Sequence, residues 1–197
     1  MHPQLTSVIQ ELDEARDRLR ALAESIDDAD WNSRADPDRW SVAECVAHLN
    51  LTTEAFLPLI DEALGRAYAR GNGLRRRLRR SLIGWMIWRS VGPRARFKSK
   101  TPARFVPKGD LARAELVEQF GRLNDELGVR IHTADGYPID RVRFTSPFDR
   151  RVKYDVYSAL TILARHQHRH LWQAEQVREA LRTSVARRSA QGATVAR

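Results

Sequence analysis

The sequence has few of the features that stabilise small secreted proteins or anchor proteins in membranes. Its one cysteine, Cys45, excludes a disulfide within the chain. Its longest apolar run, from Leu82 to Trp88, is far shorter than the roughly 20 residues of a membrane-spanning helix. A helical pattern begins almost at Met1, which leaves no room for an apolar signal region. We therefore expect a soluble, cytoplasmic protein.

Lysine is also scarce, because only four of the 34 basic residues are lysines and the rest are arginines. The formal net charge of the 197-residue chain is +9, and the sequence pI is about 10.5. This balance fits a nucleic-acid or anionic-membrane partner, since basic residues displace phosphate counterions. The alternative is a general preference for arginine in the source genome, which we favour because many segments carry the charge.

Apolar residues recur every three to four positions in four long segments, which is the period of an amphipathic α-helix. The expected helices cover residues 5–26, 41 to beyond 59, 110–131 and 154 to beyond 181. No strand pattern stands out between them. The sequence predicts an all-α four-helix bundle over residues 1–184, with an insertion at about 70–109 and a flexible C-terminal tail at 185–197.

The second helix has a clear start, and the insertion after it is unusual. Ser41 and Glu44 form an S-x-x-E capping box, with Trp40 placed to pack over the first turn. Pro58 is expected to kink the same helix. The insertion combines arginines with apolar and tryptophan residues over 74–92. It could be an amphipathic helix on a membrane or partner, but we favour a segment that folds back over its own bundle.

Three histidines lie close together in the fourth helix. At 100° per residue, His166 and His170 are about 40° apart, on the face that also carries Leu163. His168 points about 160° away from His170 and cannot join them. Two imidazoles four residues apart can bind one ion at about 2.0–2.1 Å. His48, near the edge of the apolar stripe of the second helix, is the candidate third ligand.

A core histidine that is simply hydrogen-bonded is the alternative for each of these residues. Two adjacent inward imidazoles without a shared partner would leave costly unmet polar groups in the core, which favours a shared metal ion. Imidazole ligands suit zinc, nickel and other late first-row ions. Cys45 lies one turn before His48 and could at most approach the site.

Two motifs resemble those of the DinB/YfiT-like superfamily. Residues 40–49 (WSVAECVAHL) look like its capped second helix with a histidine, and residues 166–173 (HQHRHLWQ) resemble its fourth-helix H-x-x-x-H signature followed by a glutamine. Residues 97–107 and 146–148 also look like connections of a DinB-like subfamily. The resemblance covers about residues 5–182.

The resemblance implies an up-down-down-up bundle, often a homodimer, with one metal held by His48, His166 and His170. Three protein ligands leave an open position, which would activate water or a low-molecular-weight thiol for hydrolysis or transfer on a small-molecule substrate. Glu44 and Gln173 are candidates for orienting a ligand, although capping is the favoured role of Glu44. No catalytic residue is assigned. The alternatives are a non-catalytic metal-binding stress-related protein, or a nucleic-acid or membrane-surface binder that uses residues 74–96.

Overall fold

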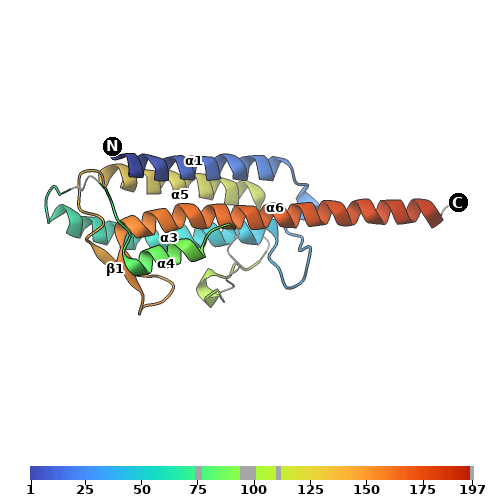
Figure 1. Cartoon of the computed structure of the whole chain (residues 1–197). Helices are drawn as coiled ribbons and strands as arrows, with labels where there is room; N and C mark the ends of the chain where they lie inside the picture. The colour runs from blue at the N-terminus through green and yellow to red at the C-terminus, as the bar shows by residue number, and fades with distance from the viewer. Residues whose placement is uncertain (74–76, 94–100, 110–111, 196–197) are drawn as a thin grey trace.

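The computed structural model describes residues 1–73, 77–93, 101–109 and 112–195, with side chains described as far as Ser184. Four long helices form the body of the molecule (Figure 1): α1 (Pro3–Glu24), α3 (Val42–Tyr68), α5 (Arg113–Thr133) and α6 (Val156–Val195). Shorter helical elements are α2 (Asp28–Trp31), α4 (Leu82–Ser90) and the 3₁₀ turn η1 (Ala103–Phe105). The predicted all-α bundle is therefore confirmed.

Each of α1 and α3 packs against both α5 and α6, so the four helices enclose one interior. Helix α1 is antiparallel to α5, because His2 bonds Asp135 at one end and Arg113 bonds Ala23 at the other. Helix α1 runs parallel to α6, and α3 runs parallel to α5, as their cross-helix hydrogen bonds show. The order of directions is up-down-down-up, as the family resemblance implied.

The hydrophobic stripe of α1 is buried along its whole length. Its inward side chains are Leu5, Val8, Leu12, Ala15, Leu19 and Leu22. Helix α3 begins at the predicted capping box, in which Ser41 and Glu44 satisfy each other's backbone N–H groups. The helix continues through Pro58 to Tyr68.

The structure corrects the expectation of no strands. Strands β1 (Arg143–Thr145) and β2 (Lys153–Asp155) form a short antiparallel hairpin just before α6. With three residues each, they are too short to show an alternating pattern in the sequence. Helix α2 lies in the connection between α1 and α3. These small elements connect the long helices and leave the bundle unchanged.

Several other expectations concern the ends and connections. Helix α6 includes residues 185–195, which we expected to form a flexible tail, and it projects beyond the rest of the bundle (Figure 1). The flexibility of that region stays a prediction. Residues 74–76 of the basic run, 94–100 of the connection and the predicted helix start at 110 lie outside the described residues. Helix α5 begins at Arg113.

The inserted helix α4 lies against α6 and the hairpin. Gly84 is buried so closely against Ser158 that a side-chain Cβ at position 84 would lie 2.1 Å from the serine Oγ. Helix α4 of the insertion therefore folds back over its own bundle. Among the described residues, no helix is both long and apolar enough to cross a membrane.

Candidate metal centre

Two antiparallel helices bring three histidines together in the middle of the bundle. His48 extends from α3, and His166 and His170 extend from successive turns of α6. The Nε2 atom of His166 lies 3.4 Å from that of His48 and 3.1 Å from that of His170. One ring nitrogen from each residue lies within 4.8 Å of the other two. The predicted partners thus converge, although metal binding itself stays a prediction.

These separations fit a shared divalent ion. Ligand nitrogens at about 2.0–2.1 Å from one ion, with tetrahedral angles between them, are about 3.3–3.4 Å apart. The observed 3.4 Å and 3.1 Å agree with that spacing to within a few tenths of an ångström. Among the described residues, no cysteine, aspartate or glutamate joins the three histidines, so the donor set consists of imidazoles alone.

The hydrogen bond of His48 fixes which of its nitrogens faces the cluster. Its Nδ1 atom lies 2.8 Å from the backbone carbonyl oxygen of Phe105. A carbonyl oxygen only accepts, so Nδ1 carries the hydrogen and donates it. In the neutral ring the Nε2 lone pair then points at the other two histidines. Metal-binding histidines are commonly oriented by such a bond from the second nitrogen.

The two histidines of α6 are less well satisfied. The Nδ1 atom of His166 is buried and has no hydrogen-bond partner among the described residues, whereas the Gln173 side chain interacts with the His170 ring. The Nε2 atom of His166 faces those of His170 and His48. Hydrogen bonds within the group cannot satisfy all these atoms, because each neutral ring donates only one hydrogen. Unpaired buried groups cost about 1–3 kcal/mol each, and a cation shared by the three rings would satisfy the Nε2 lone pairs.

Burial also controls the charge of the cluster. It lowers the pKa of His48, and the hydrogen bond to Phe105 opposes that shift only in part. Burial lowers the pKa values of His166 and His170 further, well below the ordinary value, and repulsion by neighbouring histidines and by Arg169 adds to the effect. The three rings are therefore neutral at pH 7, which is the form that binds a metal.

Aromatic rings form a wall around the cluster. The Trp40 ring lies 4.9 Å from the His48 ring and stacks at 5.9 Å from the His170 ring. Phe148 approaches His166 at 6.5 Å and stacks on Phe105 at 4.2 Å. Sequence reasoning did not identify these three aromatic residues as parts of the site. The segments that carry Phe105 and Phe148 stood out only as connections that resemble those of a family.

Glu44 has a structural role that accounts for both its carboxylate oxygens. They accept hydrogen bonds from the Ser41 backbone and from the Arg34 guanidinium, so the capping prediction is confirmed. Gln173 lies next to the cluster, and its side chain tends to raise the pKa of His170. A role for either residue in orienting a metal-bound ligand stays a prediction.

Cys45 and His168 lie apart from the cluster. Burial raises the pKa of the Cys45 thiol to about 12, so the residue is a neutral core side chain. His168 faces α1, where its Nε2 lies 3.0 Å from the Glu11 carbonyl oxygen and its Nδ1 lies 2.9 Å from the Arg18 guanidinium. The helical phase separated His168 from the other two correctly. Its side chain contacts a neighbouring helix as well as solvent.

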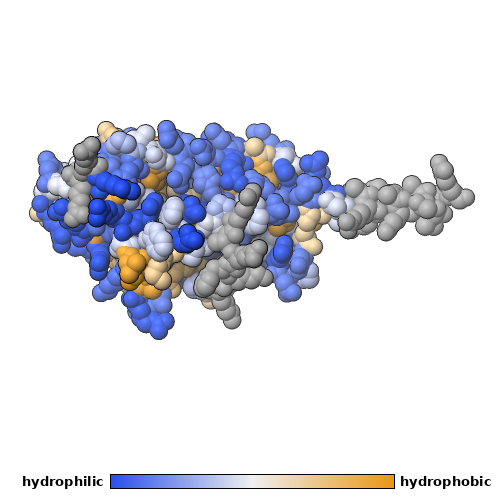
Figure 2. All heavy atoms as spheres, viewed as in Figure 1, coloured by the Kyte–Doolittle hydropathy of each residue, from blue (hydrophilic) through white to orange (hydrophobic). Residues whose placement is uncertain are grey.

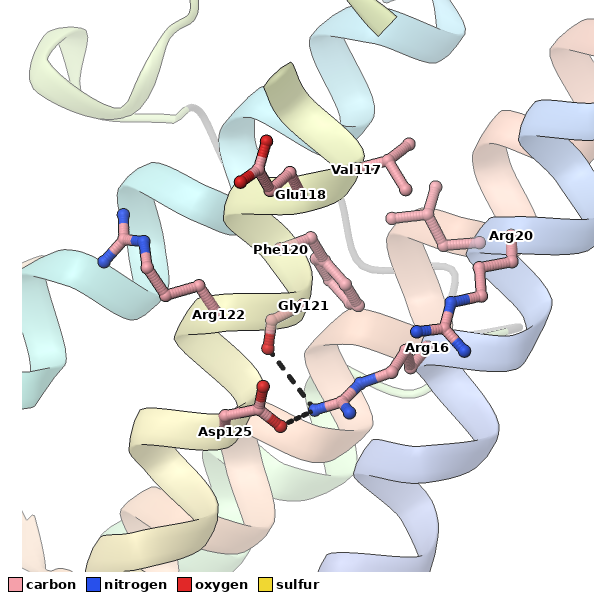
Figure 3. Close-up of a pocket in the computed structure, with 9 residues that line it drawn as sticks. Arg16, Arg20, Val117, Glu118, Phe120, Gly121, Arg122 and Asp125 are labelled. Atoms are coloured by element: carbon pink, nitrogen blue, oxygen red, sulfur yellow. Dashed lines mark hydrogen bonds and ion pairs between the residues drawn. The ribbon is translucent and has the colours of Figure 1, made fainter. Parts of the chain in front are cut away.

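A surface pocket between α1 and α5 is separate from the histidines (Figure 3). It has a volume of about 370 Å³, and its lining includes Arg16, Arg20 and Arg122. The Arg16 guanidinium bonds the Gly121 carbonyl oxygen and the Asp125 carboxylate across the pocket. None of the three histidines lines this pocket, so its chemistry is independent of theirs.

Comparison with known proteins gives one match. A sequence profile of the DinB superfamily matches residues 11–174, which include all three histidines and most of the bundle. Neither the curated proteins nor the solved structures contain a match to the chain.

Proposed function

This chain belongs to the DinB superfamily, and from that premise we propose that it is an enzyme that depends on a divalent metal ion. His48, His166 and His170 would hold the ion, leaving a position open for water or a low-molecular-weight thiol. The observation that carries the proposal is the convergence of three histidine ring nitrogens, in which the Nε2 atom of His166 lies 3.4 Å from that of His48 and 3.1 Å from that of His170. Zinc and nickel are the first ions to test, because imidazole donors suit late first-row metals.

The protein's own residues orient the ligands and limit access to them. The Phe105 carbonyl holds the His48 ring with its Nε2 lone pair directed inward. Trp40 and Phe148 cover two sides of the cluster and reduce its contact with water. A divalent ion in such a site acts as a Lewis acid and lowers the pKa of water or a thiol that binds to it.

Arg169 supplies positive charge near the site. Arg169 follows His168 on α6 and is close enough to lower the pKa values of His166 and His170. Its guanidinium donates a hydrogen bond to the Gly92 carbonyl, which holds the positive charge in place. A nearby cation stabilises a thiolate or an anionic substrate group. We propose transfer to or from a small thiol as the reaction to test first, and hydrolysis as the second.

Metal content tests the proposal directly. Wild-type protein, after reconstitution with zinc or nickel and removal of excess ion, should retain about one equivalent per chain by elemental analysis. His170→Ala should retain less than about 0.1 equivalent, because only two ligands remain. His168→Ala is the matched control, since it removes a histidine from the same helix and should retain the full equivalent. Equal loss in both variants, or no uptake by the wild type, would contradict the proposal.

Activity assays then separate the two reactions. Metal-loaded wild type should accelerate the consumption of a small thiol such as glutathione by an electrophile, and His170→Ala should not. If instead only the hydrolysis of ester or phosphoester probes is accelerated in a metal-dependent way, hydrolysis replaces transfer in the proposal. A metal-loaded protein without either activity would favour the non-catalytic metal-binding role.

A further inference from the structure

The net positive charge of this chain arises from one part of the sequence, although basic residues occur throughout it. Residues 63–109 contain fourteen arginines and lysines and no aspartate or glutamate. The rest of the chain contains 20 basic and 25 acidic residues, so by itself it is net negative. A compositional preference for arginine does not explain a region of 47 residues without one acid. The last turns of α3 and the segment that follows them are therefore locally cationic, whereas the rest of the chain is not.

Helix α4, in the middle of this segment, is apolar on the side that faces solvent. Its inner side is formed by Gly84, Ile87 and Trp88, which pack on the bundle. Its outer side presents Leu82 (73% exposed), Ile83 (44%), Trp85 (47%) and Met86 (57%). A helix that packs on a soluble bundle usually places polar residues outward, so this pattern is reversed.

The exposed apolar side chains are concentrated on this helix. Seven large hydrophobic residues are exposed among the described residues, and four of them are those of the outer side of α4. Figure 2 shows a compact orange patch over α4, surrounded mostly by hydrophilic residues. A grouped patch of this kind marks an interaction surface, whereas single exposed apolar residues need no explanation.

The bundle holds α4 in place before any partner arrives. The Ser81 side chain caps its first turn, and the Ser81 backbone N–H donates to Asp155. Two guanidinium groups contact the Trp88 ring, that of Arg80 at 4.3 Å and that of Arg165 at 4.0 Å from the ring centroid. A free helix of nine residues would be unstable in water, so docking on the bundle supplies the order that binding would otherwise require.

We propose that the outer side of α4 docks on an anionic lipid surface. Leu82, Ile83, Trp85 and Met86 would enter the boundary between headgroups and acyl chains, where leucine and tryptophan side chains partition favourably. The exposed Arg77, Arg79 and Arg89 are next to these residues in the sequence and would contact acidic headgroups. The apolar patch favours a lipid partner over a nucleic acid, which binds mainly through charge and stacking.

Vesicle co-sedimentation of the full chain tests this proposal. We expect wild type to sediment with phosphatidylcholine vesicles that contain about 30% phosphatidylglycerol and to stay largely in solution with phosphatidylcholine alone. Leu82→Glu/Met86→Glu should weaken the partitioning at least about tenfold, because it removes two apolar contacts and adds two negative charges. Both positions are exposed, so the metal content and the melting temperature should not change.

The matched control adds the same two charges elsewhere. Val129→Glu/His132→Glu alters two exposed positions of α5, on a different part of the bundle, and should keep most of the vesicle binding. Tryptophan emission gives a second measurement that needs no charge change. Anionic vesicles should shift the emission of wild type to shorter wavelength, and the shift should largely disappear in Trp85→Phe.

Three results would overturn the proposal. Equal sedimentation of wild type and of the α4 double variant would show that the patch does not bind lipid. A wild-type dimer that becomes monomeric in the α4 double variant, with no vesicle binding in either, would assign the patch to a second copy of this chain. Tight binding of duplex DNA with no vesicle binding would assign the basic segment to nucleic acid. Each result leaves the metal-site proposal unaffected, because the metal assays use different residues.

Discussion

Helix α6 places histidines in two seams of the bundle, which are its contact with α1 and its contact with α3. The histidines have different partners in the two seams. In the seam with α1, His168 has a partner at each ring nitrogen, the Glu11 carbonyl and the Arg18 guanidinium. In the seam with α3, the buried Nδ1 atom of His166 has no partner in the part of the chain that the structure describes, and its Nε2 atom faces those of His48 and His170. The same residue type within five positions thus has two structural environments.

This comparison shows that hydrogen-bond partners separate the two kinds of histidine better than burial does. Burial lowers the pKa of all of them, including that of His168. Only in the α3 seam, however, do several histidine ring nitrogens converge. Each neutral ring donates one hydrogen, so the three rings cannot satisfy all these nitrogens among themselves. In a structural histidine, the protein supplies hydrogen-bond partners for both ring nitrogens. In a metal-binding histidine, one ring nitrogen is left for the metal.

The largest expected effect is on metal-dependent stability. Zinc at about 100–1,000 times its Kd should stabilise wild type by about 3–4 kcal/mol, which is roughly 6–15 °C in melting temperature for a chain of this size. His48→Ala should abolish this shift, because it removes the α3 ligand. His168→Ala should retain it. Differential scanning calorimetry with zinc and with a chelator measures the zinc-dependent shift in each variant. An equal shift in the two variants would contradict the distinction between the two seams.

Removing an aromatic residue beside the histidines should reduce zinc affinity less than removing a histidine. Phe105→Ala removes the ring that stacks on Phe148 and loosens the turn whose carbonyl orients His48. We expect zinc affinity to fall by about 10–100-fold, as is usual when a second partner of a ligand histidine is disturbed. Phe120→Ala deletes another buried ring and is the control for general destabilisation. Competition with a fluorescent zinc chelator gives the zinc affinities. The two variants would have equal affinities if Phe105 only supported the fold.

The pH dependence of the metal-free protein should also differ between the seams. Because the folded pKa values of the histidines are lowered, the unfolded chain takes up protons first as the pH falls below about 6.5. The stability that they confer is complete above that pH and is lost as the pH falls through the folded pKa values. The melting temperature should therefore be lower at about pH 5 than at about pH 7.5.

His166→Gln should weaken this decrease more than His168→Gln does, because the pKa of His166 is lowered further. A decrease of the same size in both variants would mean that the two seams do not differ in their proton binding.

The smallest effect is expected in the α1 seam. Arg18 pairs with both carboxylate oxygens of Glu175 and also contacts His168. The pair is about one-third exposed, so Arg18→Met should cost only about 0.5–1 kcal/mol. Urea unfolding of the metal-free protein measures this cost, and elemental analysis should show an unchanged metal content. A loss of metal would show that the α1 seam also supports the site.

The amino-acid sequence predicted the long helices because each has an apolar stripe of more than four turns. It also separated His168 from His166 and His170, since local helical phase depends only on spacing. The approach of His48 was different, because 117 residues lie between it and His166 and no local rule brings them together. Family resemblance supplied that contact. The hairpin strands and α2 are too short for periodicity to show.

The parts of the site that were missed have a common cause. The Phe105 group that orients His48 is a backbone carbonyl, and every residue has one. Trp40 was interpreted as a hydrophobic staple, which did not indicate that its ring would also lie against His48 and His170. Such contacts depend on how connections cross the bundle, and that crossing is a property of tertiary packing.

The reactivity of the single cysteine reports local unfolding around α3. Cys45 is buried on α3, one turn before His48, and its thiol has a pKa of about 12. The folded chain therefore contributes almost no reactive thiol to an assay that follows a small thiol. Whenever Cys45 does react with an alkylating reagent, α3 has separated from its neighbours. The labelling rate, compared with and without zinc, then reports how often the bundle opens and whether metal binding slows that event.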